Sequence, residues 1–401
     1  MVEAPVALSL WQKAWQKPTV RWGSWLSLLI VLAGVYSPFL ANEMALVWWG
    51  PQGLSFPLLA DLFNRWSFPK YYDVYFNLAA IMLPFLLLAG WLLRHRYSLG
   101  RRVVGGGCAI LVVGSLCLVP VIPSPSGLQA VWRHRLTSTE VVTAPRDNVM
   151  AIFAPITFSA MTLVPGQVLK PPLSVDLSSG RRFWLGTDSA GKDVAAQLLA
   201  GARISLTVGL VATGLSLAIG LLIGAISGYF GGWIDLALQR VVEIMMCFPT
   251  FILILVIVAM LGRDIIIIMV VIGLTSWAGT ARLVRGEFLA QSVRDYVVAG
   301  QTLGLGSVRI MFRHIMPNAL TPLLITATFS IAGAVTSESG LSFVGLGDPT
   351  VASWGMLLEQ GRQNIQYGWL IWCPGIMVFA LVSALNLIGN GLREAIDAAA
   401  E

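Results

Sequence analysis

The chain has 401 residues, of which 56% are hydrophobic and only 11% are charged. A soluble domain carries about 25% charged residues, so this composition excludes an ordinary soluble protein and indicates an integral membrane protein. The formal net charge is +6, but the basic residues are spread between apolar segments and form no single patch with interleaved aromatic residues, which argues against a nucleic-acid partner. All four cysteines lie in apolar stretches without paired spacing, so no metal site is expected.

Eight segments are apolar over about the 17 to 25 residues that a membrane-spanning helix needs. They lie at 22–40, 74–93, 103–123, 205–227, 237–261, 265–281, 319–336 and 370–389. We therefore expect an all-α fold, a polytopic membrane helix bundle of about eight transmembrane helices. Pro249 lies inside the fifth segment and predicts a kink there.

Basic residues orient these spans. They precede the first span, follow the second at 94–102 and follow the sixth at 282–313. The positive-inside rule places all three regions in the cytoplasm, and with eight spans both termini are cytoplasmic as well. The segment 148–165 is also fairly apolar, but Pro155 interrupts it, and counting it as a span would export the arginine-rich loop after the sixth span. We leave it outside the membrane.

Three portions follow from this topology. Residues 1–123 form an N-terminal three-span portion, 124–200 a mostly external and extended stretch, and 201–401 a five-span core. The first apolar segment has a basic start like a signal peptide, but its cleavage site is weak and it is long enough to span, which favours an uncleaved helix. In the fourth span, Gly220, Gly224 and Gly228 share one helix face and predict close packing, either between subunits or, as we favour, within the chain.

The polar loop at 282–318 is the segment most typical of a coupling element. Its sequence predicts a short helix from Asp295, a stop at Gly304, a second helix, and re-entry into the membrane at Pro317. Small residues permit close approach of another surface, and arginines supply charge for docking. An ordinary basic loop would explain the charges but not this order of elements. The residues expected to act are Arg294, Asp295, Tyr296, Ala299, Gly300, Gly304, Arg309, Arg313, His314 and Pro317.

Ionisable residues inside spans are costly and usually face a bundle interior or water. Arg240 and Glu243 lie three residues apart on one helix face, and Glu338 lies near the outer end of the seventh span. These three residues are candidates for a translocation path. A structural ion pair between Arg240 and Glu243 is an equal alternative.

One segment imitates a nucleotide site. Residues 186–192 have the spacing of a phosphate-binding loop up to Lys192, but Asp193 follows where Ser or Thr should bind magnesium, and no buried strand precedes the loop. We expect no ATP site, no cofactor and no catalytic residue in this chain. His314 likewise has no Ser, Cys or Asp partner at a recognisable spacing.

Extended over 184–194, the same segment carries a family resemblance. With 201–206, 228–235, 295–318, 338–347, 353–355 and 386–393, its motifs occur in the order found in permease subunits of dipeptide and oligopeptide ABC transporters. The chain resembles that family over about 182–397. It departs where the family has an acidic residue followed by two alanines, since here the residues are Val298, Ala299 and Gly300. It also has three predicted N-terminal spans where relatives have one.

The resemblance implies an ATP-driven importer permease of the bacterial inner membrane, for di- or oligopeptides or similar small solutes. It implies a second homologous permease, two cytoplasmic ATPase subunits that hold ATP and magnesium, an external solute-binding protein and membrane lipid as partners. Loop 282–318 would couple ATPase motion to alternating access. Two other classes stay open: an ion-gradient-driven secondary transporter, in which Glu243 and Glu338 would carry protons, and a membrane scaffold.

Overall fold

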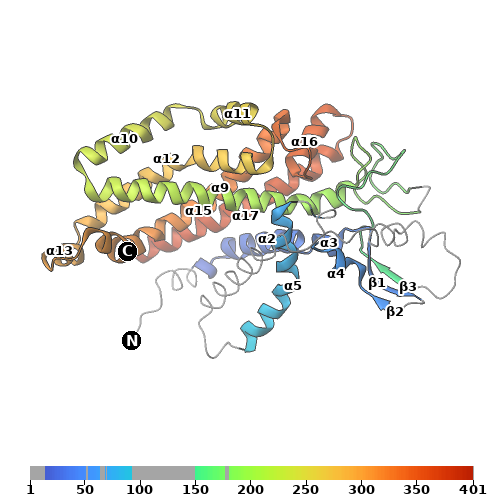
Figure 1. Ribbon diagram of the computed structural model, residues 1–401, viewed down its shortest axis with the longest axis horizontal. Coiled ribbons are helices and arrows are strands. Elements are labelled where there is room, and N and C mark those ends of the chain that lie inside the picture. Colours follow the sequence, from blue (N-terminus) through green and yellow to red (C-terminus); the bar gives the residue numbers. More distant parts are fainter. Residues whose placement is uncertain are drawn as a thin grey trace. The chain divides into compact units, whose positions relative to one another are not determined.

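The computed structural model describes residues 14–50, 53–63, 68, 70–92, 150–176 and 180–400. The third predicted span, 103–123, and the arginines at 94–102 lie outside these residues. Helices dominate the described chain (Figure 1), as the sequence predicts. In chain order they are α2 (Pro18–Val35), α3 (Ser37–Leu40), α4 (Pro57–Asp61), α5 (Tyr71–Leu92), α9 (Val194–Phe230), α10 (Gly232–Cys247), α11 (Thr250–Leu261), α12 (Ile265–Ser292), α13 (Asp295–Thr302), α14 (Ser307–Ile310), the π-helix η1 (Met311–Ile315), α15 (Met316–Leu341), the π-helix η2 (Ser342–Leu346), α16 (Trp354–Gln363) and α17 (Trp369–Ala400).

Five helical stretches of the described residues are long and apolar enough to cross a membrane: α2, α9, α12, the continuous helix from Ser307 to Leu346, and α17. A sixth is counted if α10 and α11 form one broken span. These stretches overlap six of the predicted spans. The segment at 74–93 also forms a helix, α5, although α5 is not among the five.

The predicted kink at Pro249 is a sharp break. Helices α10 and α11 meet at 82°. Pro249 has no backbone N–H to continue a helix, and the preceding residue, Phe248, is extended with ψ of 132°. The predicted kink is therefore confirmed as a break between two helices, which together can still form one broken span.

A small sheet was not predicted. Strands β1 (Ala45–Gly50), β2 (Gly53–Ser55) and β3 (Met150–Phe153) form an antiparallel sheet in the order β2-β1-β3. Strand β3 lies in the 148–165 segment. Its described part is strand and loop, which confirms the prediction that this segment is not a transmembrane helix. Helix α9 begins at Val194, before the predicted start of its span.

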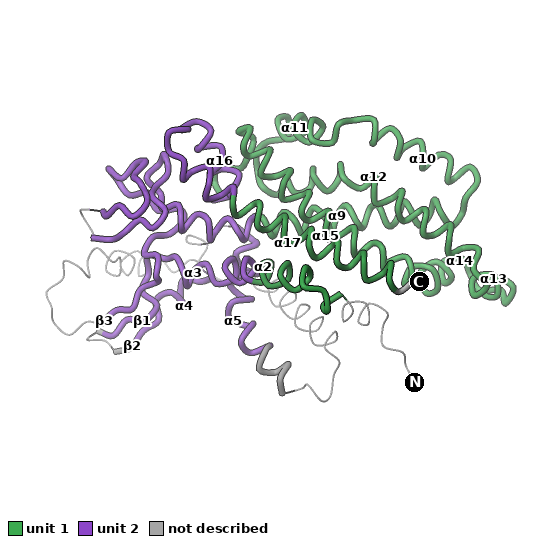
Figure 2. Tube along the Cα trace, turned by 180° about the vertical axis from the view of Figure 1, so that it is seen from behind, with its two compact units in different colours: residues 1–28, 205–351, 376–401 green, residues 29–204, 352–375 purple. Residues whose placement is uncertain are grey.

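The chain divides into two compact units (Figure 2). Unit 1 comprises residues 1–28, 205–351 and 376–401, and α12 is its most buried span. The glycine face of α9 packs on α12: a Cβ atom added at Gly224 would lie 2.5 Å from the carbonyl oxygen of Ala281. Gly220 and Gly228 make the same kind of contact one turn to either side. Packing within the chain, which the sequence favoured for these glycines, is confirmed.

Unit 2 comprises residues 29–204 and 352–375, and it holds a buried arginine at its centre. Arg203 of α9 is 2% exposed. It donates to the carbonyl oxygens of Gly34 (2.7 Å) and Val35 (3.1 Å) at the end of α2, and to Oδ1 of Asn77 (2.8 Å) and Asp73 (3.2 Å) on α5. A buried guanidinium needs such a set of acceptors. Arg203 therefore joins the N-terminal helices to the start of α9.

The glycine contact of unit 1 gives a first prediction. Gly224→Ala should lower stability by about 1–3 kcal/mol, because the new methyl group meets a backbone oxygen that cannot move aside. The matched control is Gly214→Ala, also on α9, where a Cβ atom meets nothing within 4 Å. Thermal unfolding of both variants in detergent is the measurement, and an equal midpoint for the two would contradict the close contact.

Candidate functional site

The loop after α12 folds as two helical pieces separated by a glycine turn, in agreement with the predicted order. Helix α13 begins at Asp295, which places an acidic residue in its first turn where the helix dipole favours it. Helix α14 and η1 then run without interruption into α15, and Pro317 lies in the first turn of α15. Proline is tolerated there because the first helical N–H groups have no partner within the helix.

The turn between the pieces is a Schellman motif. The N–H of Leu305 donates to the carbonyl oxygen of Gly300 (3.1 Å), and the N–H of Gly304 donates to that of Gln301 (3.0 Å). Gly304 has φ of +76°, the left-handed conformation that this motif requires. The glycine at 304 is thus explained by backbone conformation, since its absent side chain would meet nothing within 4 Å.

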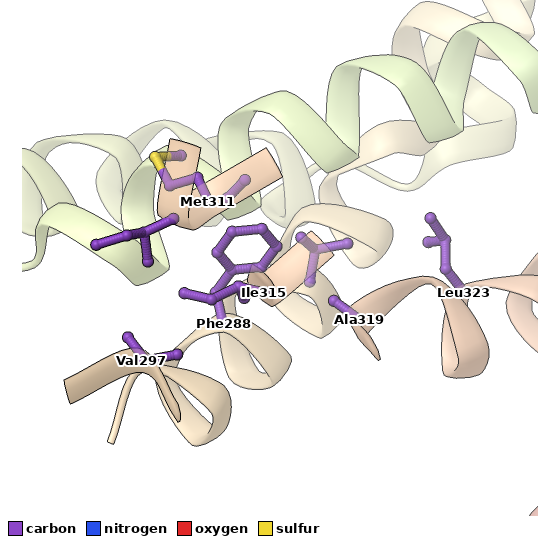
Figure 3. Close-up of a cluster of buried hydrophobic side chains, with 9 residues drawn as sticks. Phe288, Val297, Met311, Ile315, Ala319 and Leu323 are labelled. Carbon is purple, nitrogen blue, oxygen red and sulfur yellow. The ribbon is translucent and has the colours of Figure 1, made fainter. Parts of the chain in front are cut away.

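A buried apolar cluster anchors the loop (Figure 3). Phe288 of α12 is fully buried and lies among Val297 of α13, Met311 and Ile315 of η1, and the first turns of α15. Burial of side chains of this size stabilises by about 1.5–3 kcal/mol each. The cluster therefore fixes the inner face of both helical pieces against α9, α12 and α15.

A chain of hydrogen bonds completes this attachment. The hydroxyl of Tyr296 donates to Oε1 of Gln291 (2.7 Å) and accepts from Nδ2 of Asn318 (3.1 Å). Nδ2 of Asn318 also lies 3.2 Å from the carbonyl oxygen of His314. Tyr296 thus connects the end of α12 with the start of α15. The sequence predicts that Tyr296 and His314 act in this loop, but no sequence pattern indicates the contacts of Gln291 and Asn318.

The opposite face of the loop is open. Val298 is 46% exposed and Leu303, at the tip of the turn, is 81% exposed. Ala299, Arg294 and the other predicted arginines of the loop are exposed as well, whereas Gly300 is buried against Leu305. The predicted site residues are therefore split: the arginines and Ala299 are exposed, and Gly300 belongs to the anchored side.

An ion pair that the sequence did not reveal fixes the neighbouring helices. Arg285 of α12 binds Asp235 of α10 through two hydrogen bonds of 2.6 Å, and Oγ of Ser227 on α9 donates to the same carboxylate. A bidentate pair of this kind sets orientation as well as distance. Asp235 and Arg285 are 50 residues apart, so no local spacing could have predicted their contact.

The three path candidates lie in different surroundings. Arg240 and Glu243 form an ion pair of 2.6 Å with side chains 67% and 50% exposed. Glu338 is fully buried, and one of its carboxylate oxygens accepts from Oγ of Ser342 (2.9 Å). Glu338 is followed by η2, a π-helical turn of the type often found at functional sites.

In the segment resembling a phosphate-binding loop, the backbone amides donate hydrogen bonds to a side chain of the same segment. The N–H groups of Ala190 (2.9 Å) and Lys192 (2.8 Å) both donate to Oδ1 of Asp188, so these donors do not point to an open cradle. Asp193 accepts from the N–H of Ala196 (2.7 Å) at the start of α9, while its Oδ2 is buried and has no hydrogen-bond partner among the described residues. Burial raises the pKa of Asp193 to about 6.

The glycine turn gives a second prediction. Gly304→Ala should cost about 1–2 kcal/mol, because alanine is strained at positive φ, and local opening of the loop should rise about 5- to 30-fold. Gly306→Ala is the control, since Gly306 has φ of −65° and open space at its Cβ position. Trypsin cleavage rates at Arg294 and Arg309 report the opening, and equal rates in the two variants would refute the explanation.

Asp193 gives a third prediction. Its folded-state pKa of about 6 exceeds the ordinary aspartate pKa of 3.8. Stability should fall as pH rises from about 4 to about 6, because the unfolded carboxyl ionises first, and should then level off. Asp193→Asn keeps the acceptor for Ala196 and should gain up to about 3 kcal/mol at pH 8, but only about 1 kcal/mol at pH 4.5. Unfolding midpoints at both pH values test this, and a gain independent of pH would contradict it.

Comparison with known proteins places these features in a family. Residues 220–401 match the family described as "Binding-protein-dependent transport system inner membrane component". The chain is 35% identical to the oligopeptide transport system permease protein OppC of Bacillus subtilis, a match that covers 62% of this chain and 81% of that protein. It is 32% identical to the dipeptide transport system permease protein DppC of Alkalihalophilus pseudofirmus, covering 69% and 90%.

Two further similarities extend the comparison. The peptidoglycan transport system permease protein YejE of Agrobacterium fabrum is 39% identical, covering 54% of this chain and 58% of that protein. A solved structure of the MetNI methionine ABC transporter covers 50% of this chain at 19% identity with a TM-score of 0.41, which is too low to support an inference. The family match shows that the secondary-transporter alternative is wrong. The chain belongs to the family of binding-protein-dependent transport system inner membrane components and is a permease subunit of an ABC importer.

Proposed function

We propose that this permease carries peptides or similar small solutes inward, and that the exposed face of loop 294–317 receives motion from two cytoplasmic ATPase subunits. The observation that carries the proposal is the two-sided character of the loop. Its inner face is fixed by the cluster around Phe288, and its outer face presents apolar and basic side chains without a cover in the described residues. A rigidly anchored surface of this kind can transmit the displacement of a docked partner to α12 and α15.

The peptide cargo is proposed from the relatives. Their names give oligopeptide, dipeptide and peptidoglycan transport, and cargoes of these three kinds share peptide bonds or peptide stems. A second homologous permease and an external solute-binding protein complete the proposed assembly. With loop 282–318 in the cytoplasm, both termini are cytoplasmic too, as the distribution of basic residues indicates. Catalysis of ATP hydrolysis is assigned to the partners.

The proposed solute path runs along the surface where this chain meets the second permease. Arg240 and Glu243 support this placement, because an exposed ion pair in a span is tolerated beside protein or water and not beside lipid. Glu338 is proposed to lie near the outer gate, since η2 interrupts the regular helix from Ser342, four residues after it. Three portions of the chain have separate roles in this proposal. Residues 1–123 supply additional spans, residues 124–200 form an external segment, and residues 201–401 form the permease core.

Docking at the loop is tested with Leu303→Asp. A carboxylate at this 81% exposed tip should disrupt an apolar contact, so ATPase recovered with the tagged permease should fall by about tenfold, equivalent to about 1.4 kcal/mol. The control is Ile365→Asp, an equally drastic change at a residue that is 74% exposed between α16 and α17. Mass spectrometry of the purified complexes quantifies the partners.

The same measurement tests the assembly itself. The wild-type protein should bring down two ATPase chains and a sister permease in stoichiometric amounts. A homo-oligomer without ATPase would overturn the proposal. Equal ATPase recovery from the wild type, the Leu303→Asp variant and the control variant would overturn it as well.

A further inference from the structure

Asp348, which follows η2, joins the end of α15 to the start of α12. Its side chain is buried, and its Oδ2 accepts a hydrogen bond from the N–H of Ile265 (3.2 Å), the first residue of α12. The first N–H groups of a helix have no partner within the helix. Asp264, the residue before α12, accepts from the next N–H, that of Ile266 (2.8 Å). Two carboxylates therefore hold the start of α12, one adjacent in the chain and one 83 residues away from Ile265.

The turn after η2 holds this carboxylate in place. Gly345, within η2, has φ of +99°, which glycine adopts without strain, and the chain leaves the helix after Leu346. The N–H (2.8 Å) and the hydroxyl (2.6 Å) of Thr350 then donate to Oδ1 of Asp348. One carboxylate oxygen is thus fixed by its own turn, and the other meets α12. A carboxylate makes stronger hydrogen bonds than a neutral acceptor, so this link restrains both helix ends.

The opposite ends of α12 and α15 are joined as well. There the cluster around Phe288 and the hydrogen bonds of Tyr296 connect the last turns of α12 with the first turns of α15. At about 1.5 Å per residue, the 28 residues of α12 separate the two connections by about 40 Å. The two helices also contact each other, and all of these residues belong to unit 1. Packed helices that are joined at both ends resist sliding and separation.

We propose that Asp348 is a positioning residue for transport, whose bond to Ile265 makes α12 and α15 move as one rigid body through the transport cycle. This inference rests on the proposed docking of ATPase subunits at loop 294–317. With the link in place, a displacement received at the loop reaches the Asp348 end of both helices. Without it, η2 and the start of α12 move separately, and part of the displacement is lost along the way.

Hydrogen exchange in the assembled wild-type transporter tests the rigid pair without any substitution. The amide of Ile265 reports the bond, and its exchange is compared in the nucleotide-free complex and in the complex trapped with AMP-PNP, a non-hydrolysable ATP analogue. A persistent bond should give slow exchange at rates that agree within about twofold. A rise of about tenfold or more on trapping would show that the bond opens in the cycle and would overturn the proposal. Exchange at the rate of a free amide in both states would overturn it as well.

A pair of variants tests the role in transport. Asp348→Ala removes the link, and Asp264→Ala is the matched control, because it removes the other carboxylate at the start of α12 and leaves the link to η2. In Asp348→Ala, ATPase recovery and basal ATP hydrolysis should persist, whereas stimulation of hydrolysis by the solute-binding protein, purified with its native solute, should fall about tenfold. Asp264→Ala should keep the stimulation of the wild type. A merely structural role would lower basal and stimulated hydrolysis in the same proportion, so the ratio of the two identifies a positioning role.

Equal stimulation in Asp348→Ala and the wild type would contradict the proposal, and so would an equal loss in both variants. If Asp348→Ala yields no assembled complex, the exchange of Ile265 in the wild type decides. A wild-type complex that lacks ATPase, or that the binding protein does not stimulate, would contradict the proposed function instead, which separates that result from a failure of the Asp348 link.

Discussion

The close contact between α9 and α12 is the constraint on which the rest of unit 1 depends. Three glycines bring the two helices together until backbone meets backbone, and the last of them, Gly228, lies against the carbonyl oxygen of Arg285 and Cβ of Phe288. With α12 at this position, Arg285 reaches Asp235, and Phe288 lies in the apolar cluster. A larger side chain on α9 would move α12 outward and would disturb the ion pair and the cluster together. Packing between spans thus determines where the loop is held.

The packing of the spans explains why a loop of short helices can be rigid. Helices of four to eight residues have little stability of their own in water. Here α13 is closed at its C-terminus by the Schellman turn, held by Tyr296 at its N-terminal turn, and buried at Val297. The stiffness therefore comes from tertiary contacts with α12 and α15. Under the proposed coupling, a displacement of the exposed side of the loop would therefore be transmitted to α12 and α15 together.

The sequence predicted those features that depend on local rules. Apolar length located the spans, and the glycine and proline positions located the ends of α13 and the start of α15, because caps and turns are set by residues within a few positions of each other. The sequence missed contacts between distant residues, such as Arg285 with Asp235 and Arg203 with Asp73, since nothing in the spacing of such pairs encodes them. It also missed the sheet, because β2 has only three residues and β1 and β3 are separated by a long segment.

Arg203 ties the N-terminal helices to the start of α9. The arginine belongs to a motif at 201–206 that resembles the family's sequence, and its side-chain acceptors lie on α5, in the portion where the sequence predicts more spans than the family has. A buried guanidinium that lost those acceptors would be left unsatisfied at a cost of several kcal/mol. Helix α5 is therefore required at the start of α9, and a chain that lacked α5 would need other acceptors for the same arginine. Helix α5 is in this respect a structural part of unit 2 and not an independent appendage.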